Sequence, residues 1–151
     1  MLLAALFVLS SFQEPPMPDQ PPLSPREAIE ANANLVAETM SDAAGFALAR
    51  DERSLAYVDG FIGRQREGWL AAGQTDQYVS ILGSFAGAVV IEQHDGTWVQ
   101  DEGGIAVEIR PGFRVFPMNK VRKQIENGED DSILSWFQTI GPMLAAAPDA
   151  R

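Results

Sequence analysis

The period of the hydrophobic pattern changes near residue 97, and this change constrains the fold more than any other feature of the chain. Before it, apolar residues recur every three or four positions, as on one face of a helix: Ile29, Ala33, Val36, Met40, Ala44 and Ala47. After it, apolar residues occupy alternate positions, as in a half-buried strand: Ile105, Val107 and Ile109. The two periods predict an α+β fold, with N-terminal helices packed on a small antiparallel three-stranded meander and two C-terminal helices after it.

Capping residues indicate where the helices begin. Ser24, Pro25 and Glu27 match a capping box with proline in the first turn, so a helix is predicted from Ser24 to about Leu48. Two further N-terminal helices are predicted, over residues 51–72 with Gly73 as the stop, and from a cap at Thr75 onward.

The sequence leaves the end of the third helix open. The β-branched run at residues 89–91 precedes Asp95-Gly96, a pair typical of hairpin turns, so a late strand is an alternative there. The later boundaries follow from turn, cap and stop residues: turns at 103–104 and 111–112, a short helix from a cap at Asn119 to 127–128, and a last helix from Asp130 or Asp131 to 141–142.

The N-terminus carries an apolar run of eight residues, from Leu2 to Leu9. A membrane-spanning helix needs roughly 20 apolar residues, whereas the core of a secretory signal needs about 7 to 15. We therefore expect a periplasmic or secreted protein without a stable membrane span, with a cytoplasmic one as the alternative. The expected organisation is a signal region at 1–13, a proline-rich linker at 14–25, one globular domain at 26–145 and a frayed tail at 146–151.

Composition excludes several classes of function. The chain has 21 Asp and Glu against 11 Lys and Arg, a formal charge of −10, which disfavours binding to the phosphate backbone of nucleic acids. It has no cysteine and one histidine, so disulfides, thiolate metal sites and thiol nucleophiles are absent. No cofactor or metal is expected, and neither a P-loop nor a dinucleotide-binding glycine motif follows a predicted strand.

Gly83 and Gly87 lie four residues apart on the third predicted helix. Such a pair lets another segment approach the helix backbone closely, and core packing is the favoured interpretation. A homodimer contact on the same face is the alternative.

Near the predicted sheet lie residues that would suit a binding or catalytic site. Trp98 is either a binding aromatic or part of the core, and Asp101 and Glu102 form an acidic loop after the first strand. Together with His94 and Asp95, these carboxylates offer an alternative hypothesis, a small hydrolase. No nucleophile motif accompanies them, so no catalytic residue is assigned.

A basic cluster, Lys120, Arg122 and Lys123, opens the short helix after the sheet. It would dock an anion or an acidic partner. The competing interpretation is a solvated helix in which Arg122 pairs with Glu126 one turn later.

The segment from residue 81 to 137 resembles a family of small bacterial domains of unknown function. The resemblance rests on a glycine pair, a Gly-x-Trp strand, a Phe-Pro-x-x-Lys-Val helix start and a few later residues: Leu82-Gly83, Gly87, Gly96-Thr97-Trp98, Ile105 to Ile109, Phe116-Pro117, Lys120-Val121, Lys123, Gly128 and Asp131-Ser132-Ile133. It implies a helical N-terminal half, a small antiparallel sheet and C-terminal helices, and it supplies no catalytic residue.

These observations together predict an exported, noncatalytic module that binds a protein or a small ligand in the bacterial envelope. The candidate binding residues are those of the acidic loop, the basic cluster and the strand aromatic: Trp98, Asp101, Glu102, Lys120, Arg122 and Lys123. The alternatives are the hydrolase with carboxylates near His94 and an immunity-like inhibitor, whose acidic surface would speed its encounter with a basic toxin.

Overall fold

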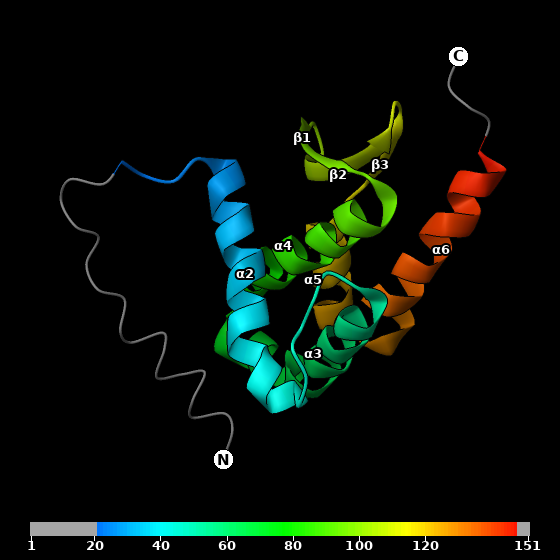
Figure 1. The fold of residues 1–151 in the computed structure, drawn as a ribbon. Helices are drawn as coiled ribbons and strands as arrows, with labels where there is room; N and C mark the ends of the chain where they lie inside the picture. The colour runs from blue at the N-terminus through cyan, green and yellow to red at the C-terminus, as the bar shows by residue number, and fades with distance from the viewer. Residues whose placement is uncertain (1–20, 148–151) are drawn as a thin grey trace.

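The computed structural model describes residues 21–147, and the predicted signal region, most of the linker and the end of the tail lie outside this range. Three helices come first, then three strands, then two helices with a short 3-10 turn between them (Figure 1): α2 (Pro25–Ala44), α3 (Glu52–Ala72), α4 (Thr75–His94), β1 (Thr97–Asp101), β2 (Gly104–Arg110), β3 (Phe113–Val115), α5 (Pro117–Asn127), η1 (Glu129–Asp131) and α6 (Ile133–Ala146). The expected α+β class and element order are confirmed.

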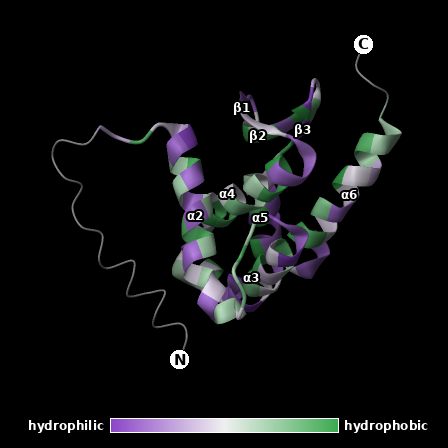
Figure 2. Ribbon diagram, viewed as in Figure 1, coloured by the Kyte–Doolittle hydropathy of each residue, from purple (hydrophilic) through white to green (hydrophobic). Residues whose placement is uncertain are grey.

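Helix α4 forms the centre of the fold. It packs against α2 and α5 and also touches α3, α6 and β2. Residues 82–90 of α4 are buried without interruption, so this helix is enclosed on all sides rather than along one stripe. In Figure 2 the visible middle of α4 is pale to green, whereas α2 alternates between purple and green along its length.

The buried glycine pair explains how two neighbours approach α4 so closely. A Cβ added to Gly83 would lie 2.9 Å from the Cα of Met118 in α5, and one added to Gly87 would lie 2.0 Å from Cη2 of Trp98 in β1. Elements of the same chain therefore cover this face. Core packing is the correct interpretation of the pair, and the homodimer contact is wrong.

Local caps set most helix ends as predicted. Ser24 and Glu27 form the capping box of α2, and the Asp51 side chain accepts a hydrogen bond from the Ser54 N–H at the start of α3. Helix α2 ends at Ala44, before the expected Leu48, because Gly45 adopts a left-handed conformation with φ of 77°.

At α4 the predicted cap is wrong, and so is the alternative of a late strand with a hairpin turn. Thr75 lies inside the helix, and Gln74 takes the cap position without a side-chain hydrogen bond. The late strand at residues 89–91 does not form, since Val89 and Val90 are fully buried in the core as part of the helix. Asp95, with φ of 56°, ends the helix, so Asp95-Gly96 is a helix terminus and not a hairpin turn.

The sheet is the predicted antiparallel meander with strand order β1-β2-β3. Asp101 pairs with Gly104 at the first turn and Arg110 with Phe113 at the second, and a register shift lies between Glu108 and Arg110. Ala106 and Val107 of β2 are fully buried, so the middle strand joins the sheet to the helical core.

The C-terminal helices begin and end at other residues than predicted. Helix α5 begins at Pro117 rather than after a cap at Asn119, and α6 begins after the Ser132 cap, beyond Asp130 and Asp131 in η1. Helix α6 also continues through Gly141-Pro142 to Ala146.

Two features explain why Pro142 does not end α6. Proline crowds the carbonyl four residues earlier, which here belongs to the exposed residue Gln138 rather than to a residue of the core. The Arg110 guanidinium then holds the end of the helix, because its Nη2 donates to the carbonyls of Leu144 at 2.7 Å and Ala147 at 3.2 Å. None of the helices within residues 21–147 is long and apolar enough to cross a bilayer.

Candidate functional site

A groove of about 310 Å³ lies between the first turns of α2 and the strand β1. Eight residues line it and define what we call the β1 groove: Ser24, Pro25, Arg26, Ile29, Trp98, Val99, Gln100 and Ile105. Three consecutive residues of β1 contribute to it. Because neighbouring side chains of a strand point to opposite faces, a groove touched by three in a row runs along the edge of the strand.

Within residues 21–147, strand β1 pairs with β2 alone and so forms an edge of the sheet. Figure 1 shows β1 on the side of the sheet that faces α2, with β3 on the far side. An edge strand carries backbone N–H and C=O groups that its own sheet does not use. The β1 groove thus places unused backbone groups beside an apolar wall that includes Ile29 and Ile105.

Trp98 lies at the boundary between the core and the groove. Its ring packs on Gly87 of α4, and the residue also lines the groove. Its indole Nε1 is buried and has no hydrogen-bond partner among the described residues. Leaving a buried donor unpaired costs on the order of 1–3 kcal/mol.

Among the described residues, Arg26 is the only charged side chain that lines the groove. It is exposed and forms no hydrogen bond or ion pair with any residue between 21 and 147. The adjacent carboxylate, Glu27, is occupied, because its Oε2 accepts hydrogen bonds from Ser24 N at 2.8 Å and Ser24 Oγ at 2.7 Å. These bonds lower the pKa of Glu27 and keep its charge at the helix start.

The predicted acidic loop is held by an ion pair. Asp101 accepts a hydrogen bond from Gly103 N at 3.0 Å and one from Arg114 Nη1 at 2.6 Å, and these contacts lower the pKa of Asp101. Arg114 also bonds Glu108 at 2.8 Å across the sheet. Asp101 therefore joins the strands of the meander, whereas Glu102 is exposed at the turn.

The hydrolase arrangement is not assembled. His94 and Asp95 precede β1, and Asp101 closes its other end, four residues after Thr97 and so about 13 Å away along the strand. The His94 ring packs against Phe137 of α6, with ring centroids 5.7 Å apart. Within residues 21–147, no three His, Asp or Glu side chains are grouped so that they could hold a metal ion.

The basic cluster on α5 is largely paired. Lys120 Nζ lies 3.0 Å from Asp131 Oδ1 in η1, and Arg122 Nη2 lies 2.7 Å from Asp76 Oδ1 in α4. The expected pair between Arg122 and Glu126 is not the one observed, because Asp76 of a neighbouring helix is in reach. Lys123 is exposed and forms no ion pair within the part of the chain that the structure describes.

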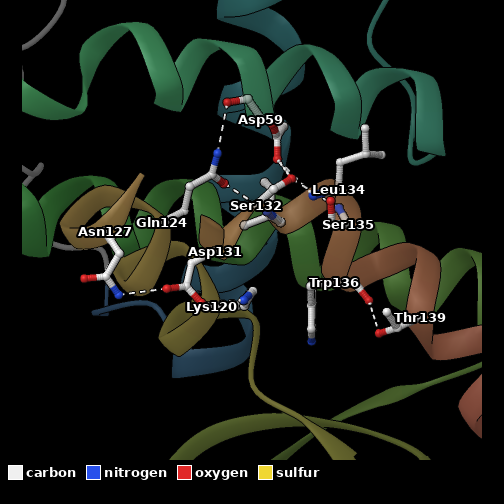
Figure 3. A network of polar contacts seen from close by, with 11 residues as sticks. Asp59, Lys120, Gln124, Asn127, Asp131, Ser132, Leu134, Ser135, Trp136 and Thr139 are labelled. Atoms are coloured by element: carbon white, nitrogen blue, oxygen red, sulfur yellow. Dashed lines mark hydrogen bonds and ion pairs between the residues drawn. The ribbon is translucent and has the colours of Figure 1, made fainter. Parts of the chain in front are cut away.

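A network that the sequence analysis did not identify joins α3, α5 and α6 (Figure 3). The Asp59 carboxylate accepts hydrogen bonds from Ser132 Oγ and from Leu134 N at 3.0 Å. Gln124, which is almost fully buried, donates to the Asp59 carbonyl at 3.3 Å and accepts from Ile133 N at 3.0 Å. These side chains accept hydrogen bonds from N–H groups at the start of α6, so the network stabilises the packing of α3, α5 and α6.

Of the predicted binding residues, Trp98 alone lines the groove. The structure adds Arg26, Ile29, Gln100 and Ile105 to the candidate site. Neither Arg26 nor Ile29 could be assigned to a site from the sequence, because the proximity of α2 to β1 depends on how both elements pack around α4.

Comparison of the chain with protein-family models, with curated proteins and with solved structures gives no match. The resemblance to a family of small bacterial domains therefore stays a prediction.

Proposed function

We propose that this chain is a noncatalytic module that binds an extended segment of another protein in the β1 groove. The observation that carries the proposal is the position of the groove along an unpaired strand edge. A peptide that adds to such an edge gains main-chain hydrogen bonds, and neighbouring pockets select its side chains.

The lining of the groove supports a peptide ligand. Val99 and Ile105 are partly exposed and offer apolar contact, Ile29 is a largely buried part of the same wall, and the partly buried Trp98 also lines the groove. Burial of one apolar side chain of the partner would contribute about 1.5–3 kcal/mol.

The first experiment is selection of a displayed library of random dodecapeptides on the purified chain. The groove variant is Val99→Lys, and Leu70→Lys is the matched control, because Leu70 is 41% exposed on α3. We expect enriched peptides that bind the parent chain and the Leu70→Lys variant but not the Val99→Lys variant. Absence of enrichment, or equal binding to both variants, would overturn the proposal.

A spectroscopic readout shows where an enriched peptide binds. The chain has three tryptophans, so its nitrogen-15 NMR spectrum contains three indole N–H signals. We expect the Trp98 signal to shift on titration with a synthetic enriched peptide, while the Trp69 signal, from a buried ring stacked on Tyr78, stays in place.

Location in the envelope is the second part of the proposal. It rests on the apolar run from Leu2 to Leu9, which lies outside the described residues. Intact mass of the protein from separated envelope and cytoplasmic fractions of its host tests it. A shortened species in the envelope is expected, and a full-length cytoplasmic species would contradict export.

A further inference from the structure

Among the described residues, Arg26 is an exposed cation in the lining of the β1 groove that has no ion-pair partner. Three acidic side chains nearby are engaged elsewhere: Glu27 in the capping box, Glu30 with Arg50, and Asp101 with Arg114. Arg26 has no such partner in the described range. A guanidinium binds a carboxylate through two parallel hydrogen bonds, which a neutral side chain does not match.

We propose that the segment bound in the β1 groove places an acidic side chain against Arg26 and an apolar side chain, two residues away, against Ile29. This inference rests on the proposed function and names the sequence that the groove selects. The inference is carried by charge complementarity with Arg26, the one charged lining residue in the described part of the chain, and by the apolar Ile29 one turn later on α2.

The spacing of the two contacts would match an extended segment that ran roughly along the axis of α2 at this point. Arg26 and Ile29 are three residues apart, which corresponds to about 4.5 Å along a helix axis. Side chains on one face of a strand recur about every 6.7 Å, two residues apart. The long Arg26 side chain spans the difference of about 2 Å. We therefore expect the bound segment to contain an apolar residue, then any residue, then Asp or Glu, or the same three in reverse order.

The overall charge of −10 does not prevent an acidic side chain of the ligand from pairing with Arg26. Repulsion between the chain and an acidic segment acts over long range and is screened beyond about 8 Å at physiological ionic strength. The pair with Arg26 forms at contact distance. An isolated acidic residue with apolar neighbours is therefore the expected ligand, rather than a run of acidic residues.

The test repeats the dodecapeptide selection with three forms of Arg26: the parent chain, Arg26→Gln and Arg26→Glu. We expect Asp or Glu to be enriched two positions from an apolar residue on the parent chain, this enrichment to vanish with Arg26→Gln, and Lys or Arg to replace it with Arg26→Glu. Arg64→Gln, at an exposed arginine of α3, is the matched control and should select like the parent. A synthetic parent-selected peptide should bind Arg26→Gln about two- to fivefold more weakly, as for an exposed ion pair.

The outcomes separate this inference from the function on which it rests. Peptides that are lost with Val99→Lys but show no acidic preference, or bind Arg26→Gln as tightly as the parent, would overturn the inference alone. Failure to enrich any peptide that depends on the groove would overturn the proposed function as well.

Discussion

Met118 lies directly over Gly83, so close that a Cβ on the glycine would be 2.9 Å from the Met118 Cα. The contact is with backbone, and a rotamer change of the methionine cannot relieve it. The approach of α5 to α4 therefore depends on the missing side chain.

Gly83→Ala should destabilise the chain by about 1–3 kcal/mol, because the methyl group would overpack this helix contact. Gly63→Ala is the matched control in α3, where an added Cβ meets nothing within 4 Å. It should stabilise the chain by about 0.5–1 kcal/mol through helix propensity. Urea unfolding monitored by circular dichroism measures both changes, and equal effects of the two substitutions would contradict the contact.

Asp59→Ala should destabilise the chain by about 1–2 kcal/mol, because the Leu134 N–H and the Ser132 hydroxyl would lose their acceptor at the start of α6. Glu38→Ala, at an exposed position of α2, should change stability little. Urea midpoints compare the two variants. A small effect of Asp59→Ala would mean that the Ser132 cap and Gln124 suffice for this helix terminus.

Stability should fall as pH drops below about 4, where carboxylates with lowered pKa values become protonated. Asn127 and Lys120 lower the pKa of Asp131, so this carboxylate stabilises the fold above its ordinary pKa. That contribution is lost as pH falls through the lowered value. Asp131→Asn should flatten the decline of the urea midpoint between pH 5 and pH 2.

Asp130→Asn is the control for the pH series, since Asp130 is an exposed neighbour on η1. It should decline in parallel with the parent chain. If Asp131→Asn declined in parallel too, the contacts of Asp131 would not contribute to acid unfolding.

Arg110→Ala should loosen the last turn of α6, because the Leu144 and Ala147 carbonyls would lose a charged donor. The global unfolding midpoint should change less than the protection of amides in residues 143–147 against hydrogen exchange. Arg64→Ala, at an exposed site of α3, should leave both measurements unchanged. Unaltered protection of α6 in Arg110→Ala would contradict this role.

Local chemistry made most of the secondary structure predictable. The Ser24 capping box, the stop at Gly73 and the Pro111-Gly112 turn act through neighbours within a few residues, so the sequence displays them directly. The α+β class followed in the same way from the two hydrophobic periods.

The errors occur where distant residues decide the outcome. Val89 and Val90 favour a strand by themselves, but burial at the centre of the core keeps them helical. Arg122 has Glu126 one turn away on its own helix, yet Asp76 of α4 takes the pair. The candidate site was found only in part for the same reason, because Arg26 and Trp98 are 72 positions apart in the sequence.

The burial of α4 on all sides affects how the chain folds. The hydrophobic period changes just after α4, so the chain could be cut there into a helical fragment and a fragment that contains the sheet. In the helical fragment, residues 82–90 would no longer be buried by α5 and β2. Neither fragment should fold when expressed alone. Mixed together, the two fragments should recover structure only by associating, as the halves of one cooperative folding unit do.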